Sequence, residues 1–204
     1  MSYSFPCLVF EPIQQNTSTS RTTIVLLHGG SSNNESLRPL APYFEHFRLL
    51  LPQAPLKVGD GVFDWFRFAD EQLNVDQDSL KHGIESLSSF LNEVRRETEG
   101  NLVVAGISQG AVFAGELFFH SEVQFDGLMM LSGFLSSDTE AFYNGKRAFV
   151  AHGSNDPLIP IKRAIRSIEK LREHRLNVEF KAYEIGHDIS EEEVVDAVEW
   201  LNEF

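Results

Sequence analysis

The chain has 204 residues, which is enough for one domain of ordinary size, and we expect residues 1–204 to form a single domain. Hydrophobic residues make up 42% and charged residues 23%, a globular composition that excludes an intrinsically disordered chain. The net charge of −13 argues against nucleic-acid binding and against stable association with anionic membranes, because both require clustered lysine and arginine.

Short apolar runs rich in β-branched residues alternate with longer segments of helical period, which is the pattern of an α/β protein. Several runs are apolar on both faces, as expected for parallel strands that helices cover on either side. The sequence therefore predicts a mostly parallel central sheet with helices on both faces. Its predicted strands are Cys7–Phe10, Thr23–Leu27, Phe47–Leu51, Leu102–Ala105, Gly127–Leu131, Ala148–Ala151 and Val178–Tyr183.

Apolar residues at intervals of three or four predict helices over residues 76–97, 161–171 and 190–201. Ser190 and Glu193 have the spacing of a capping box at the start of the third. A further helix near residues 36–44 is expected to be irregular, because Pro39 and Pro42 interrupt it. The polar run from Asn16 to Ser20 is interpreted as a hairpin turn.

The long connection over residues 54–74 contains several aromatic side chains, among them Trp65 and Phe66. Long ordered connections in a compact domain are often functional. Trp65, Phe66 and the later Phe134 are therefore candidate substrate-binding residues that could line an apolar acyl groove. The alternative, that these rings anchor their loops to the core, has equal support in the sequence.

The strongest local motif is Gly106-Ile-Ser108-Gln-Gly110, which joins an apolar strand to a segment of small residues that suits a helix. A serine on such a sharp turn is pushed out above the sheet, and the glycines permit the tight turn. The N-terminus of the following helix presents N–H groups to developing negative charge. Ser108 is thus predicted to be a nucleophile.

A nucleophilic serine needs a base, and the base needs a carboxylate to orient it. His187 follows the last predicted strand, and Asp156 follows the strand before it, so both would lie at the same sheet edge as Ser108. We therefore predict a Ser108–His187–Asp156 triad. Asp126 precedes a strand and should lie at the opposite edge, whereas Asp138 is a weaker alternative acid.

Two N–H donors are also required to stabilise the oxyanion of the transition state. One should be the backbone amide of Gln109, directly after the nucleophile. The other should come from the loop His28-Gly29-Gly30 after an early strand, where we expect the amide of Gly30 to serve.

Together, the runs His28-Gly29-Gly30, Gly106-Ile-Ser-Gln-Gly110, His152-Gly-Ser-Asn-Asp156-Pro and Gly186-His187 resemble the phospholipase/carboxylesterase family of α/β hydrolases. This family includes acyl-protein thioesterases and small bacterial carboxylesterases. The resemblance implies an α/β-hydrolase fold with no separate cap domain. It also implies the same triad and the same oxyanion hole that the residues themselves suggest.

The chain departs from the family pattern in two places. Ser31 and Ser32 follow Gly30 where many members have Gly-Asp, and Ala111 replaces a frequent glycine. The first departure bears on the shape of the loop beside the acyl group, and hence on the choice of substrate. The triad residues are unaffected by either change.

The expected activity is hydrolysis of a small-molecule acyl ester or thioester through an acyl-enzyme, with no metal and no cofactor. Alternatives are a lysophospholipase, a dienelactone-type hydrolase or peptidase on the same scaffold, and a non-catalytic binding module. The single cysteine, Cys7, excludes an intrachain disulfide. The absence of a basic-then-apolar leader predicts a cytoplasmic location. A homodimer is possible through a sheet edge or the aromatic loop.

Overall fold

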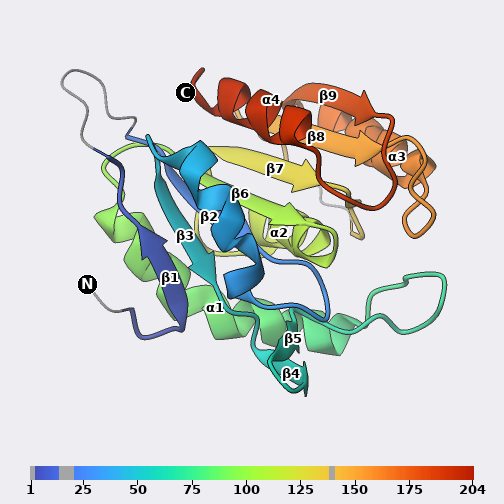
Figure 1. The fold of residues 1–204 in the computed structure, drawn as a ribbon, viewed down its shortest axis with the longest axis horizontal. Coiled ribbons are helices and arrows are strands. Elements are labelled where there is room, and N and C mark those ends of the chain that lie inside the picture. The colour runs from blue at the N-terminus through green and yellow to red at the C-terminus, as the bar shows by residue number, and fades with distance from the viewer. Residues whose placement is uncertain (1–2, 14–20, 138–140) are drawn as a thin grey trace.

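The central element of the computed structural model, which describes residues 3–13, 21–137 and 141–204, is a seven-stranded sheet of order β1-β3-β2-β6-β7-β8-β9 (Figure 1). All seven predicted strands are confirmed, with ends that differ by at most two residues. They are β1 (Cys7–Phe10), β2 (Thr23–Leu27), β3 (Arg48–Pro52), β6 (Leu102–Ile107), β7 (Gly127–Leu131), β8 (Arg147–Gly153) and β9 (Asn177–Tyr183).

Six of these strands are parallel, and only β1 pairs antiparallel, with β3. The carboxyl ends of the parallel strands therefore meet at one edge of the sheet, as the arrowheads of β6, β7 and β8 show (Figure 1). Leu27 of β2 lies opposite Gly106 of β6, and Ile107 of β6 lies opposite Leu131 of β7. The loops that leave these strands are thus neighbours in space.

Helices cover both faces of the sheet, because strands with two apolar faces must be shielded from water on both sides. One buried cluster joins the sheet to α1 (Gln77–Glu97), α2 (Gln109–His120) and α3 (Ile161–Glu173). A second joins the other face to η1 (Asn34–Phe44) and α4 (Glu191–Leu201). In Figure 1, α4 lies on the near side of the sheet and α1 on the far side.

The helix between β2 and β3 differs in type from an ordinary α-helix. Residues 34–44 form the 3₁₀ helix η1, in which Asn33 caps the first turn by accepting the N–H of Ser36. Pro39 and Pro42 lie inside it and lack the N–H groups that a regular α-helical ladder would use. The expected irregularity is therefore confirmed: the segment forms a 3₁₀ helix, which is wound more tightly than an α-helix.

The connection over residues 54–74 contains a small antiparallel hairpin that the sequence pattern does not predict. It consists of β4 (Leu56–Gly59) and β5 (Val62–Asp64), and Gly61 has a left-handed φ of 68° at its turn. Apart from this hairpin, the described helices and strands belong to the sheet and its two covering layers, so this part of the chain has no separate cap domain. The proposed turn at residues 16–20 lies outside the described residues.

None of the helices in the described ranges is both long enough and apolar enough to span a bilayer. The longest, α1, has 21 residues, and its buried residues, such as Leu80, Leu87 and Leu91, form a stripe along one side. This helix therefore packs its apolar stripe on the sheet and presents charged side chains to water.

Candidate active site

Ser108 occupies a strained turn between β6 and α2. Its φ of 55° and ψ of −117° place it in a region that side-chain-bearing residues rarely adopt. The flanking glycines permit this turn, because a Cβ atom on Gly106 would collide with the Gly110 carbonyl and one on Gly110 would collide with the His28 carbonyl. The local sequence thus positions the Ser108 hydroxyl above the edge of the sheet.

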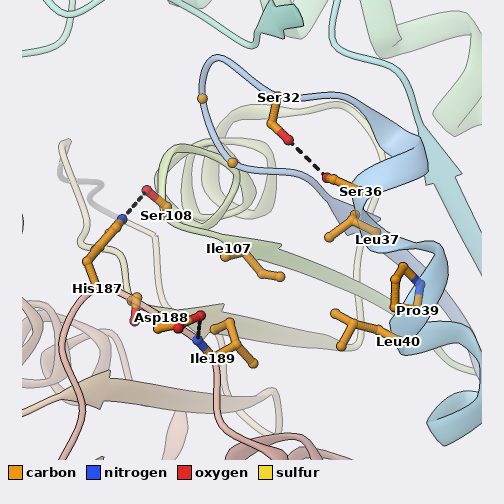
Figure 2. Close-up of a pocket in the computed structure, with 13 residues that line it drawn as sticks. Ser32, Ser36, Leu37, Pro39, Leu40, Ile107, Ser108, His187, Asp188 and Ile189 are labelled. Carbon is orange, nitrogen blue, oxygen red and sulfur yellow. Dashed lines mark hydrogen bonds between the residues drawn. The ribbon is translucent and has the colours of Figure 1, made fainter.

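Three side chains from distant parts of the chain form a continuous chain of hydrogen bonds. His187 Nε2 lies 2.8 Å from Ser108 Oγ, and His187 Nδ1 lies 2.7 Å from Asp156 Oδ2 (Figure 2 shows the first contact). A carboxylate only accepts hydrogen bonds, so the ring proton resides on Nδ1. Nε2 is then the acceptor for the serine hydroxyl, which is the arrangement that a general base requires.

The Asp156 carboxyl is fully buried and highly hydrogen-bonded. Its Oδ1 accepts the backbone N–H groups of Leu158 and Ile159 at 2.8 and 2.9 Å, which leaves Oδ2 directed at His187. Burial alone would raise the pKa of Asp156, but the hydrogen bonds from His187 and from the two backbone N–H groups outweigh it and hold that pKa below the ordinary value. Asp156 is therefore a carboxylate at neutral pH.

A second histidine, which is buried, lies beside this carboxylate; it opens one of the motifs quoted above, but no role was predicted for it. His152, near the end of β8, has its Nε2 3.4 Å from Asp156 Oδ2 and 2.7 Å from the carbonyl oxygen of Ile159. Because a carbonyl only accepts, Nε2 carries a proton directed at Ile159. His152 thus braces the turn that carries Asp156, and its spacing of four residues from that aspartate was the available signal.

Of the other candidate acids, Asp126 does not approach Ser108. Asp126 lies at the opposite edge of the sheet, where it forms ion pairs with Arg95 and Lys146. Asp138 lies outside the described residues. In the described ranges, no cluster of three or more His, Cys, Asp or Glu side chains is arranged to hold a metal ion.

The two backbone segments predicted to form an oxyanion hole lie next to each other. A Cβ atom on Gly30 would lie 3.1 Å from the side-chain Cδ and Nε2 atoms of Gln109. The next amide along the loop, that of Ser31, is already engaged, because it donates to Asp64 Oδ1 at 2.5 Å. This leaves Gly30 as the better candidate donor within that loop.

Beside Ser108 is a cavity of about 450 Å³, formed by η1, the loop after β2 and the loop that carries His187 (Figure 2). On its polar side, Ser32 Oγ and Ser36 Oγ are 2.9 Å apart, and the exposed Asp188 lies near His187. The apolar part of its lining is Leu37, Pro39, Leu40, Ile107 and Ile189.

The three aromatic residues proposed to bind substrate do not line this cavity. Trp65 and Phe66 are fully buried, and Phe134 is 1% exposed. Trp65 stacks on Phe113 at 5.2 Å between ring centroids, and the guanidinium of Arg163 lies 3.4 Å above Phe134. The acyl-groove interpretation is therefore corrected: the rings anchor their loops to the core, since large apolar side chains gain most by full burial.

A family model described as Phospholipase/Carboxylesterase matches residues 10–204. Among curated proteins, acyl-protein thioesterase 1 of Kluyveromyces lactis is 26% identical over 220 residues, covering 93% of this chain and 95% of that protein. Acyl-protein thioesterase 1 of Saccharomyces cerevisiae is also 26% identical, covering 89% and 92%.

Solved structures give a consistent result for the fold. The Bacillus cereus carboxylesterase superposes with a TM-score of 0.83 at 27% identity, covering 98% of this chain and 94% of that one. The carboxylesterase from Mesorhizobium loti superposes with a TM-score of 0.80 at 23% identity, covering 90% and 89%. The predicted α/β-hydrolase fold is thus confirmed over nearly the whole chain.

Proposed function

Since the chain belongs to the phospholipase/carboxylesterase family, whose members hydrolyse ester bonds, we propose that Ser108, His187 and Asp156 are its catalytic triad. The observation that carries this proposal is the unbroken series of hydrogen bonds from Asp156 through His187 to Ser108, with contacts of 2.7 and 2.8 Å. Each of the three residues follows a different parallel strand, and a fold alone does not require them to meet.

In the first half-reaction, Ser108 Oγ attacks the carbonyl carbon of an ester or thioester while His187 Nε2 accepts the hydroxyl proton. Asp156 holds the ring and stabilises the imidazolium that forms. The backbone amides of Gly30 and Gln109 donate to the oxyanion. His187 then returns the proton to the departing alcohol or thiol as the bond from carbon to that group breaks.

The second half-reaction releases the acyl group. Water attacks the carbonyl of the acyl-enzyme while His187 Nε2 accepts one of its protons, and the bond to Ser108 Oγ breaks as that oxygen regains a proton from the histidine. Over the full cycle the acyl group passes from the leaving group to Ser108 and then to water, while His187 carries the protons, so the hydrolysis balances with water as the co-reactant.

The cavity beside Ser108 supports a compact, uncharged acyl group as the favoured substrate moiety. Leu37, Leu40 and Ile189 offer apolar surface to such a group. The carboxylate of Asp188 at the same cavity disfavours a negatively charged acyl group. A lysophospholipase activity would place the same chemistry on a longer acyl chain.

The experiment that tests the proposal is labelling with a fluorophosphonate probe, with mass spectrometry of the adduct and assays on p-nitrophenyl acetate and butyrate. We expect a single adduct on Ser108 and loss of both labelling and turnover in Ser108→Ala. His187→Ala should lose turnover by several orders of magnitude. A folded wild-type protein with neither adduct nor turnover would favour the non-catalytic binding module instead.

A further inference from the structure

Trp65 donates two buried hydrogen bonds, one to each side of the candidate oxyanion hole. Its indole Nε1–H donates to the backbone carbonyl of His28 at 2.7 Å, and its backbone N–H donates to Gln109 Oε1 at 2.9 Å. The residue is fully buried, and both partners are at least 96% buried. A single residue from the β5 loop therefore connects the loop after β2 with the nucleophile turn.

On one side of Trp65, the contacts of His28 determine how the Gly30 amide is oriented. The backbone N–H of Ala54 donates to His28 Nε2 at 3.1 Å, so the ring proton must reside on Nδ1. Nδ1–H then donates to the carbonyl of Gly29 at 2.7 Å. That carbonyl shares one planar peptide unit with the Gly30 N–H, so holding the carbonyl also holds the direction of the donor.

The protonation state of His28 reinforces this arrangement. Burial lowers the pKa of His28, so the ring remains neutral in the physiological range and keeps the single tautomer that the Ala54 contact selects. The indole of Trp65 packs against the same ring, with centroids 5.0 Å apart. His28 is thus held by contacts on its ring and on its carbonyl.

On the other side of Trp65, the side chain of Gln109 is held at both of its polar atoms. Oε1 accepts the Trp65 backbone N–H, and Nε2 donates to the carbonyl of Phe66 at 3.1 Å. Gln109 is also the residue whose own backbone amide is the second oxyanion donor. Its side chain therefore ties that amide to the same two-residue segment that holds His28.

We propose that Trp65 is a positioning residue, which fixes the separation of the Gly30 and Gln109 amides and so matches them to the oxyanion of the transition state. This inference rests on the proposed serine-hydrolase function. Preorganised donors are effective because they need no reorganisation during the reaction, and a misplacement of about 1 Å can cost on the order of 100-fold in rate. Loss of the indole N–H should therefore affect kcat far more than KM.

The informative variant is Trp65→Phe, which keeps a buried aromatic ring and the backbone donor but removes the indole N–H. Trp200→Phe is the matched control: Trp200 is 2% exposed and belongs to the cluster on the opposite face of the sheet. Both substitutions replace a buried indole with a smaller phenyl ring, so they remove a similar volume from a core. Only the first removes the donor to the His28 carbonyl.

The two variants and the wild type would be compared in ester hydrolysis and in inhibition by two ligands. An alkyl trifluoromethyl ketone forms a tetrahedral adduct whose oxyanion uses the hole, whereas the corresponding alkyl carboxamide binds without forming one. For Trp65→Phe we expect kcat to fall about 10- to 100-fold, with KM within twofold. The affinity for the trifluoromethyl ketone should fall by a similar factor, and the affinity for the carboxamide should stay unchanged.

A purely structural role would give a different result. Trp65→Phe would then lower the melting temperature as Trp200→Phe does, with kcat and both inhibition constants matching those of the control, and the proposal would be overturned. If Trp65→Phe does not fold, Gln109→Met is used instead. It removes the side-chain contact with the Trp65 backbone N–H but keeps the backbone N–H at position 109. A fall in kcat and weaker inhibition by the trifluoromethyl ketone alone would support the proposal, and values equal to those of the control would overturn it. An inactive, unlabelled wild type would instead refute the serine-hydrolase function itself.

Discussion

The Nδ1 atom of His187 lies 2.7 Å from the Oδ2 atom of Asp156, although 31 residues separate them in the chain. The contact arises because Asp156 and His187 follow β8 and β9, which are adjacent and parallel, with Gly153 paired to Tyr183 at the end of the register. A Cβ atom on Gly153 would collide with the Gly186 carbonyl, so the two loops approach as closely as backbones allow. The hydrogen bond between His187 and Asp156 therefore follows from the adjacent carboxyl ends of β8 and β9.

Replacing Asp156 by asparagine tests the role of that carboxylate. The amide can donate to His187 Nδ1 and so favour the tautomer with its proton on Nε2, where it cannot accept the proton of Ser108. We expect kcat to fall on the order of 1,000- to 10,000-fold at pH 7, with KM nearly unchanged. Steady-state hydrolysis of p-nitrophenyl butyrate measures this.

The control for this variant is Asp126→Asn, at the opposite edge of the sheet. Asp126 is also hydrogen-bonded, by Lys146 and by the backbone N–H of Leu102, so its replacement imposes a comparable structural loss. We expect Asp126→Asn to lower thermal stability and to keep kcat within a fewfold of wild type. Equal losses of kcat in the two variants would contradict the assignment of Asp156.

Two glycines close to Ser108 should respond differently to an added methyl group. In Gly106→Ala, the Cβ atom would collide with the Gly110 backbone, which cannot move without disrupting the turn. We expect a loss of at least about 3 kcal/mol in the free energy of unfolding. In Gly29→Ala, the nearest atoms are Ser108 Cβ at 3.7 Å and the Ile107 carbonyl oxygen at 3.8 Å, which are ordinary contacts.

For Gly29→Ala we therefore expect a change of less than about 1 kcal/mol. Urea denaturation followed by far-UV circular dichroism compares the two alanine variants directly. A stable, cooperatively folding Gly106→Ala protein would show that the turn is less tightly constrained than its packing indicates.

Asp188 should influence which substrate charges the cavity accepts. It is exposed and lies at the cavity next to His187. Replacing it by lysine should raise kcat/KM for an anionic ester, such as a p-nitrophenyl hemisuccinate, relative to neutral p-nitrophenyl butyrate. A change of roughly tenfold corresponds to about 1.4 kcal/mol, and added salt should reduce it.

The matched control for Asp188→Lys is Glu184→Lys, which changes the net charge equally at an exposed residue that does not line the cavity. We expect no change in the ratio of the two kcat/KM values for this control. An equal change in both lysine variants would mean that overall charge, rather than the position of Asp188, sets the preference.

The sequence allowed the fold and the positions of Ser108, Asp156 and His187 to be predicted because each depends on a local pattern. Buried strands can be recognised from their apolar composition. Parallel strands bring their carboxyl ends to one edge of the sheet, whatever residues the loops contain. The glycines that flank Ser108 likewise indicate a tight turn from the local sequence alone. Patterns of this kind can be recognised without knowing which residues are in contact in the fold.

The placement of Trp65 could not be predicted, because the same cluster of aromatic residues suits a groove and a core equally. The deciding facts are its contacts with His28 and Gln109, which lie 37 and 44 residues away in the chain. The β4–β5 hairpin was missed for a related reason: its strands have three or four residues, too few for an alternating pattern to be recognised.

Glu193 is a buried carboxyl group outside the proposed triad, and it makes the stability of the fold depend on pH. It lies in the first turn of α4 and is 0% exposed, and neither carboxyl oxygen has a hydrogen-bond partner among the described residues. Burial, aided by the nearby carboxylate of Asp188 and opposed by the backbone N–H of Ser190, raises the pKa of Glu193 to about 7. The folded protein therefore holds this proton at pH values where the unfolded chain has released it.

The sign of the effect follows from proton binding. Between about pH 4.5 and 7, the unfolded state binds fewer protons at this residue than the folded state, so the free energy of unfolding falls as the pH rises, by about 3 kcal/mol in total. Glu193→Gln carries no charge at any pH. It should therefore match the wild type near pH 4.5 and be more stable above pH 7, whereas the exposed neighbour Glu192→Gln should keep the wild-type dependence. Urea denaturation of the three proteins at pH 5 and pH 8 measures this, and a difference between Glu193→Gln and wild type that does not change with pH would contradict a buried, protonated Glu193.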